Sequence, residues 1–188
     1  MRGRVAGSSE AQTGRGEHVA VFYAHDRELI ETVGQFLLDG LQDGVAIAMA
    51  TRGHRRALDA WLECAGVDVP GSIRARRYIE VDAADTLARV MVEGWPDPAG
   101  FWQAIMPLMD EAASSGRPVR IFGELVSLLW ESGQVGAAID VEALWNELGA
   151  QHPFDLICGN AAESASLAEH SDSFAMLCSA HTRTVAEQ

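Results

Sequence analysis

The sequence contains no lysine, because all 14 of its Lys and Arg residues are arginine. A P-loop uses a lysine to hold nucleotide phosphates, and enzymes that form Schiff bases react through one. The absence of lysine therefore excludes a working P-loop NTPase and any enzyme whose covalent intermediate forms on a lysine.

Cysteine and long apolar runs are also scarce. The three cysteines, Cys64, Cys158 and Cys178, are odd in number and far apart in sequence, which is not the pattern of a disulfide framework. No apolar run reaches the ~18–20 residues that a membrane span needs. No apolar segment follows the N-terminal arginines as it would in a signal peptide. We therefore expect a cytoplasmic protein with no membrane partner.

Positive charge is in short supply over most of the chain. The formal net charge is −13, and the first 16 residues carry three arginines and one glutamate, which leaves −15 on residues 17–188. Such an acidic surface repels phosphates, so we expect no direct nucleic-acid binding. The first 16 residues are rich in Gly, Ser and Arg without periodicity. We expect a disordered tail over 1–16 and a single domain over 17–188.

Short apolar runs alternate with segments whose apolar residues recur at helical spacing. Runs of strand type occur at 18–23, 45–51, 73–81, 119–125 and 154–160. Helical spacing predicts helices near 29–41, 57–65, 85–93, 101–115, 126–131, 137–148 and 173–181, and we expect a loop at 95–100. Uniformly apolar strands are typical of a parallel sheet buried on both faces. We predict a three-layer α/β fold, in which helices cover both faces of a mainly parallel sheet of five or more strands.

Polar residues follow several of these strands. Ligands of open parallel sheets bind at the carboxyl ends of the strands, where the sequence delivers Tyr23, Thr51, Glu124 and Cys158. Glu124 is the most suggestive, because it lies between an apolar strand and an apolar segment. A carboxylate so flanked is either a functional group or a buried structural anchor. For Thr51 a helix cap is an equally good interpretation.

The segment after the first strand is where a P-loop would lie. Residues 23–28 (YAHDRE) contain no glycine, and they place Asp26 and Glu28 where phosphates would sit. A P-loop needs glycines whose backbone amides cradle phosphate. We therefore predict no ATP or GTP binding at this position.

Possible metal ligands are dispersed along the chain, with no CxxC or HExxH spacing. If the fold brings such ligands together, His18, Cys158 and His181 are the candidates. Thiolate and imidazole ligands would favour zinc or copper(I) over magnesium. A buried cysteine is more often a small apolar residue, so we predict no cofactor.

Four motifs, taken in order, resemble the MEDS family, the methanogen/methylotroph sensory domain first associated with a dichloromethane-responsive regulator. They are 18–23 (HVAVFY), 36–44 (FLLDGLQDG), 120–124 (RIFGE) and 154–158 (FDLIC), and the closing 177–181 (LCSAH) resembles the family's C-terminal segment. The resemblance covers about residues 17–185. Gly159 and Asn160 follow Cys158 where family members often carry an aromatic residue, so the ligand's identity does not carry over.

The resemblance implies a RecA-like fold, similar to circadian-clock ATPases, that has lost its nucleotide loop. It also implies a sensor of small organic compounds, hydrocarbon-derived or one-carbon in type, rather than an enzyme. Family members are often joined to transcription regulators, histidine kinases or anti-sigma pathway modules. We therefore expect a regulatory protein as partner, or a second copy of the chain. Motifs and strand ends together give the predicted ligand-binding residues His18, Phe22, Tyr23, Thr51, Glu124 and Cys158.

Two other functions fit the same residues. An enzyme acting on a small carbonyl or halogenated compound would use Glu124, Tyr23 and Cys158, whereas an interaction module would use its acidic surface and bind no ligand. For a sensor, residues 93–100 are a candidate mobile element, because glycines and prolines bracket Trp95 there. A rigid connector is the competing interpretation of that segment.

Overall fold

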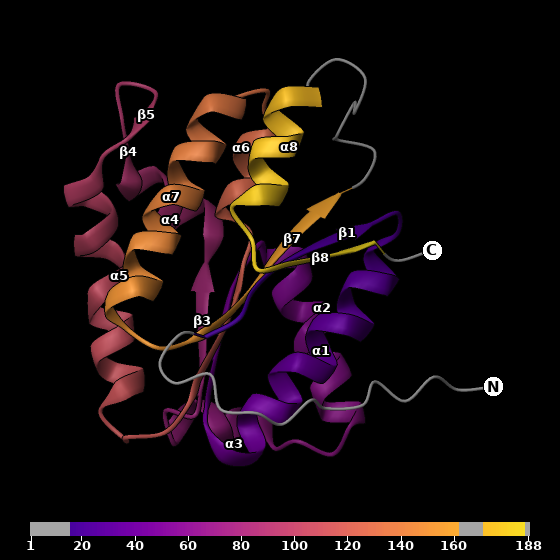
Figure 1. Ribbon diagram of the computed structural model, residues 1–188. Coiled ribbons are helices and arrows are strands. Elements are labelled where there is room, and N and C mark those ends of the chain that lie inside the picture. The colour runs from indigo at the N-terminus through magenta and orange to yellow at the C-terminus, as the bar shows by residue number, and fades with distance from the viewer. Residues whose placement is uncertain (1–15, 162–170, 187–188) are drawn as a thin grey trace.

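The computed structural model describes residues 16–161 and 171–186, and its centre is one parallel sheet. The strands lie in the order β3-β2-β6-β7-β1-β8 (Figure 1). They are β1 (His18–Tyr23), β2 (Val45–Ala50), β3 (Tyr78–Asp82), β6 (Val119–Gly123), β7 (Asp155–Ala161) and β8 (Arg183–Ala186). The predicted three-layer α/β class is confirmed, and the arrangement is consistent with a RecA-like fold.

Helices cover both faces of this sheet (Figure 1). On one face lie α1 (Asp26–Asp43), α2 (Arg52–Cys64) and α3 (Val69–Arg74). On the other lie α4 (Ala83–Val90), α5 (Pro98–Ala113), α6 (Leu125–Glu131), α7 (Val135–Gln151) and α8 (Ser171–Ser179). Each face therefore has its own apolar core, with the sheet between them.

Aromatic packing fixes the larger of the two cores. The Trp145 ring meets Phe101 edge-on, with ring centroids 5.2 Å apart, and Phe154 at 6.2 Å. Trp145 is 1% exposed. Burying a large apolar side chain contributes about 1.5–3 kcal/mol, so this cluster holds α5 and α7 firmly against the sheet.

The pleat of β1 decides which of its residues share a site. Successive side chains of a strand point to opposite faces. Ala20 and Phe22 pack in the core under α5–α8, whereas Val21 and Tyr23 pack in the core under α1 and α2. The neighbouring residues Phe22 and Tyr23 therefore face different layers of the molecule.

Capping side chains start several helices directly after a strand. Thr51 accepts a hydrogen bond from the backbone N–H of His54 at the start of α2, and Asp82 accepts one from Asp85 at the start of α4. Such caps satisfy N–H groups that have no partner within the helix. Thr51 therefore caps helix α2, which is one of the two roles that the sequence allowed for it.

The sequence-based strand at 73–81 is wrong in its first half. Residues 69–74 form α3, which Asp68 caps and which carries Pro70 in its first turn. Proline at the start of a helix loses no hydrogen bond, and an N-cap aspartate stabilises the first turn. These two local signals outweigh the apolar pattern, and the strand begins only at Tyr78.

The loop expected at 95–100 is also wrong. Residues Met91–Val92 (β4) and Trp95–Pro96 (β5) pair as an antiparallel hairpin, and Pro98 already begins α5. Glu93 and Gly94, at the turn, have φ angles of 51° and 86°. Positive φ at both central residues is the geometry of a tight two-residue hairpin turn.

The sixth strand, β8, was not expected from the sequence. It pairs parallel to β1, with Val19 opposite Arg183. Among the described residues, no helix is both long and apolar enough to cross a bilayer.

Candidate functional site

The first group of polar side chains lies at the carboxyl ends of β2 and β6, and Glu124 is at its centre. Glu124 is 2% exposed. Its Oε2 accepts a hydrogen bond from the backbone N–H of Thr51 at 2.5 Å, and its Oε1 contacts Nδ1 of His54. The Nε2 atom of His54 lies 3.6 Å from Oδ1 of the exposed Asp26. His54 therefore bridges a buried carboxylate and a surface carboxylate.

Burial and the nearby Glu124 shift the pKa values of three side chains in this group. The hydrogen bond that His54 donates to the Glu124 carboxylate raises the pKa of His54 despite its burial. Burial, followed by the charge of Glu124, raises the pKa of Tyr23 and that of Glu131. The Tyr23 hydroxyl therefore stays protonated, which suits a hydrogen-bond donor rather than a base.

At the start of α1, a carboxylate takes the place that a phosphate would need. Oε2 of Glu28 accepts hydrogen bonds from the backbone N–H groups of Ala24 and His25, both at 3.2 Å. Free backbone amides at a helix N-terminus are what binds phosphate in nucleotide-binding folds. Here the chain's own acid occupies two of them.

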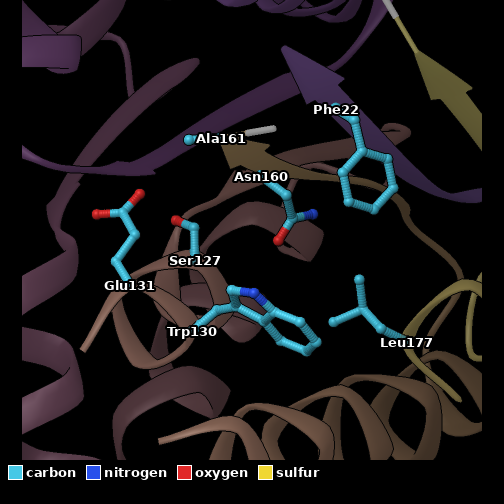
Figure 2. Close-up of a pocket in the computed structure, with 7 residues that line it drawn as sticks. All are labelled: Phe22, Ser127, Trp130, Glu131, Asn160, Ala161 and Leu177. Carbon is cyan, nitrogen blue, oxygen red and sulfur yellow. The ribbon is translucent and has the colours of Figure 1, made fainter. Parts of the chain in front are cut away.

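The second group surrounds a pocket under α8, on the face of the sheet away from Tyr23, and Glu131 belongs to both groups. We call this cavity the α8 pocket, and Figure 2 shows its lining residues: Phe22, Ser127, Trp130, Glu131, Asn160, Ala161 and Leu177. The Phe22 ring, the Trp130 indole, the Asn160 amide and the Leu177 side chain converge on a common space (Figure 2). The free volume of the cavity itself is about 10 Å³, room for about one water molecule, so its own side chains nearly fill it.

Two strands and two helices build this pocket. Phe22 comes from the end of β1 and Asn160 from the end of β7, where the two residues pair in register. Helix α6 supplies Ser127 and Trp130, and α8 supplies Leu177. The Nδ2 of Asn160 donates to the backbone oxygen of Cys158 at 3.3 Å, which fixes the orientation of the amide.

The third group is a buried cluster of His18, Glu142, Cys158 and His181, which we call the His–Cys–Glu cluster. One potential ligand atom from each side chain lies within 4.8 Å of all the others. His18 begins β1, Glu142 is on α7, Cys158 is in the middle of β7, and His181 follows α8. The fold thus brings together the three dispersed candidates for metal binding and adds a carboxylate.

Distances within the cluster are close to contact. The Nε2 of His18 lies 3.2 Å from Oε2 of Glu142 and 3.3 Å from Sγ of Cys158. The Nε2 of His181 lies 3.2 Å from Oε1 of Glu142. Burial alone would raise the pKa of Glu142, but the two imidazole rings outweigh it and lower that pKa to about 2. Burial and the Glu142 charge raise the pKa of the Cys158 thiol.

The six residues predicted to bind the ligand do not form one cleft. Tyr23, Thr51 and Glu124 lie in the carboxyl-end group, Phe22 lines the α8 pocket, and His18 and Cys158 belong to the His–Cys–Glu cluster. The sequence predicts Cys158 at the carboxyl end of its strand, but the residue lies in mid-strand and pairs with Ala20. The enzyme alternative needed Cys158 beside Tyr23, and the sheet separates the two side chains.

Several residues of these groups were not among the sequence-based candidates. They are His54, Ser127, Trp130, Glu142 and Leu177. Glu142 carried a usable signal, because it interrupts the buried stripe of Ala138, Val141 and Trp145 on α7. A carboxylate on the apolar stripe of a helix needs a partner in the core.

Comparisons with known proteins agree with this architecture. No curated protein matches the chain. The fold is similar to a solved structure from Pyrococcus horikoshii OT3, whose title is a structural study of Project ID PH0250. The TM-score is 0.57 and the sequence identity 11%, and the match covers 93% of this chain and 83% of that one. At this identity the likeness shows the fold alone. Residues 17–174 match the family described as MEDS, the methanogen/methylotroph, DcmR sensory domain. This chain therefore belongs to the MEDS family of sensory domains.

Proposed function

We propose that this sensory domain binds a small organic compound, hydrocarbon-derived or one-carbon in type, in the α8 pocket. The observation that carries the proposal is the lining of that pocket, where aromatic and aliphatic side chains face a few fixed polar groups. This is the usual composition of a small-molecule site. The pocket also lies where parallel α/β sheets bind ligands, at the carboxyl ends of β1 and β7.

The chemistry of the lining limits the ligand. Phe22, Trp130 and Leu177 offer apolar surface, and all three are less than 10% exposed. Asn160 and Ser127 offer polar atoms inside, and the exposed Glu131 lies at the mouth. The free volume of about 10 Å³ is far below the ~300–1,000 Å³ of sites for drug-sized ligands, so a ligand enters only when Phe22 and Leu177 move apart. A compound of a few heavy atoms, apolar apart from one polar or halogen substituent, fits this lining.

Helix α8 is the element through which binding can be reported. The Phe174 ring of α8 packs on Phe22 with centroids 5.1 Å apart, and Leu177 closes the pocket from the same helix. A ligand between Phe22 and Leu177 favours one position of α8 over another. A ligand can shift a conformational equilibrium only through such a difference in affinity.

The output goes to a regulatory protein. Because residues 17–188 carry a charge of −15, a partner with a basic surface associates most readily. The partner classes are a transcription regulator, a kinase or an anti-sigma pathway protein. A second copy of the chain is the other candidate.

The test is a titration of the ¹⁵N-labelled protein with dichloromethane and methanol, followed by NMR at the five tryptophan indole N–H groups. The indole of Trp130 should shift in a saturable manner. That of Trp61, which packs against α1 on the opposite side of the sheet, should not. Asn160→Ala should weaken binding, whereas Trp95→Ala at the β4–β5 hairpin should not. Equal shifts of all the indoles, or no saturation with either compound, would contradict the assignment of the pocket.

A further inference from the structure

We infer that the His–Cys–Glu cluster is a binding site for one divalent transition-metal ion of the zinc type. The site would use Nε2 of His18, Nε2 of His181, Sγ of Cys158 and one carboxylate oxygen of Glu142. Four elements distant in sequence supply these atoms. The inference stands on the geometry of the cluster and does not depend on the ligand proposed for the α8 pocket.

Three contacts within the cluster are close to the ligand spacing of a tetrahedral site. Zinc bonds of ~2.0–2.3 Å at tetrahedral angles place neighbouring ligand atoms roughly 3.3–3.7 Å apart. His18 Nε2 lies 3.2 Å from Oε2 of Glu142 and 3.3 Å from Sγ of Cys158, and His181 Nε2 lies 3.2 Å from the other carboxylate oxygen, Oε1. Binding through one oxygen therefore requires the Glu142 carboxylate to rotate. All four atoms lie within 4.8 Å of one another. Small adjustments of side chains therefore suffice to surround an ion.

Outer hydrogen bonds orient both imidazole rings toward this centre. The Nδ1 of His181 lies 2.7 Å from the backbone oxygen of Leu177, so Nδ1 must carry the proton and donate it. The Nδ1 of His18 lies 3.1 Å from Oδ1 of Asn146, whose Nδ2 donates to the backbone oxygen of Ala180 and so fixes the amide. In the neutral rings both Nε2 atoms therefore present lone pairs inward. Metal-ligating histidines are held in this way.

The buried carboxylate of Glu142 also supports a metal site, because it has no hydrogen bond of good geometry. Neither oxygen of Glu142 has a hydrogen-bond partner among the described residues, and neither does Nε2 of His181, although all are buried. The two rings can compensate this buried carboxylate in two ways: as imidazolium ions, which lower the pKa of Glu142, or as neutral ligands that share a cation with it. In the second case the cation offsets the cost of burying the carboxylate.

Charge balance selects the ion. With Glu142 and Cys158 both ionised, the cluster contributes two negative charges, which a divalent ion neutralises. Binding forms an Sγ–metal bond and releases the Cys158 proton to solvent. Copper(I) would leave a buried net charge of −1, and magnesium prefers oxygen ligands in an octahedral arrangement. Zinc satisfies both the charge and the mixed nitrogen, sulfur and oxygen ligands.

An ion would reach the cluster from the side of His18. A hollow of about 260 Å³ is lined by His18, Asn146 and Thr182 among others. Once bound, the ion would join the segment after α8 to β1, α7 and β7. Thr182 already hydrogen-bonds to the His18 backbone on both its N–H and its C=O, so this segment is positioned before the ion binds.

The test uses tag-free protein titrated with cobalt(II), a visible substitute for zinc, followed by competition with zinc. The parent and Cys64→Ser, which alters an exposed cysteine, should each bind one ion and show a thiolate-to-cobalt charge-transfer band. Cys158→Ser should lose the band, and Glu142→Gln and His181→Gln should bind at least about tenfold more weakly. Circular dichroism establishes that each variant is folded.

Asn146→Ala keeps all four ligands and changes only an exposed residue, so it tests the site even if a cluster variant fails to fold. Loss of the hydrogen bond to His18 should weaken cobalt(II) binding by about 10–100-fold. Three results would overturn the inference: no ion bound by the folded parent, a charge-transfer band that survives Cys158→Ser, or preference for copper(I) or magnesium over zinc.

Discussion

His181 and Glu142 meet on the buried side of α8: Nε2 of the histidine lies 3.2 Å from Oε1 of the carboxylate. The contact joins the segment after α8 to α7, only four residues beyond Leu177 in the wall of the α8 pocket. The position of the pocket wall is therefore linked to the state of the His–Cys–Glu cluster. An ion bound in the cluster and a ligand bound in the α8 pocket would therefore both act on helix α8.

Removal of metal should lower the stability of the fold. An ion that binds only the folded state at ~100 times its dissociation constant adds about 2.7 kcal/mol to the free energy of unfolding. Urea denaturation with added zinc and then with excess chelator should show this difference in the parent and in Cys64→Ser. In Cys158→Ser the two curves should nearly coincide. Coincident curves in the parent would count against a specific site.

Nucleotide should not bind at the start of α1. Glu28 occupies the Ala24 and His25 amides that would hold a phosphate, and the chain has no lysine to assist them. Isothermal titration calorimetry with Mg-ATP should show no binding up to millimolar concentration. Micromolar affinity would show that this interpretation of the segment is wrong.

The His54–Glu124 contact should make stability depend on pH. Glu124 raises the pKa of His54 in the folded state above the unfolded value of ~6.5. The contribution is therefore complete below about pH 6.5 and is lost as pH rises through the folded pKa. Because His54 is only half-buried, we expect less than about 1 kcal/mol. Urea denaturation from pH 5.5 to 9 should show this loss in the parent and in His152→Gln. The loss should be smaller in His54→Gln, where only His181, whose pKa Glu142 raises despite burial, still contributes.

Glu124→Gln separates the carboxyl-end group from the α8 pocket. The substitution removes the charged partner of His54 inside the protein, which should cost about 1–3 kcal/mol of stability. Binding of dichloromethane or methanol at Trp130 should persist, because Glu124 does not line the pocket. A variant that is folded but has lost binding would move the ligand site to Glu124 and Tyr23.

The sheet could be predicted from the sequence because its central strands are buried on both faces. Continuous apolar runs such as Val45–Ala50 have few alternatives to a buried parallel strand. The edge strand β8 escaped prediction because it begins with Arg183 and Thr184 and has only four residues. At the edge of a sheet the apolar pattern of a strand is weak, so this segment forms a strand because it pairs with β1.

The sites were harder to predict than the fold, because they depend on the faces of strands and helices. His18, Phe22 and Tyr23 are adjacent in one motif, yet the pleat of β1 sends Tyr23 away from the other two. Glu142 joins the cluster only because α7 crosses β1 and β7 at that point. No spacing in the sequence predicts this crossing. The sequence offers only the dispersed His18, Cys158 and His181 as candidate ligands, and the structure places these three side chains together.

The most direct test of the proposed sensor is to locate a bound compound by intermolecular nuclear Overhauser effects. With methanol at saturation, its methyl protons should give contacts to the Leu177 methyl groups and to the Phe22 ring, since both line the α8 pocket. Asn160→Ala should abolish these contacts under the same conditions. Contacts confined to Tyr23 and His54, or none from any saturating one-carbon compound, would contradict the account.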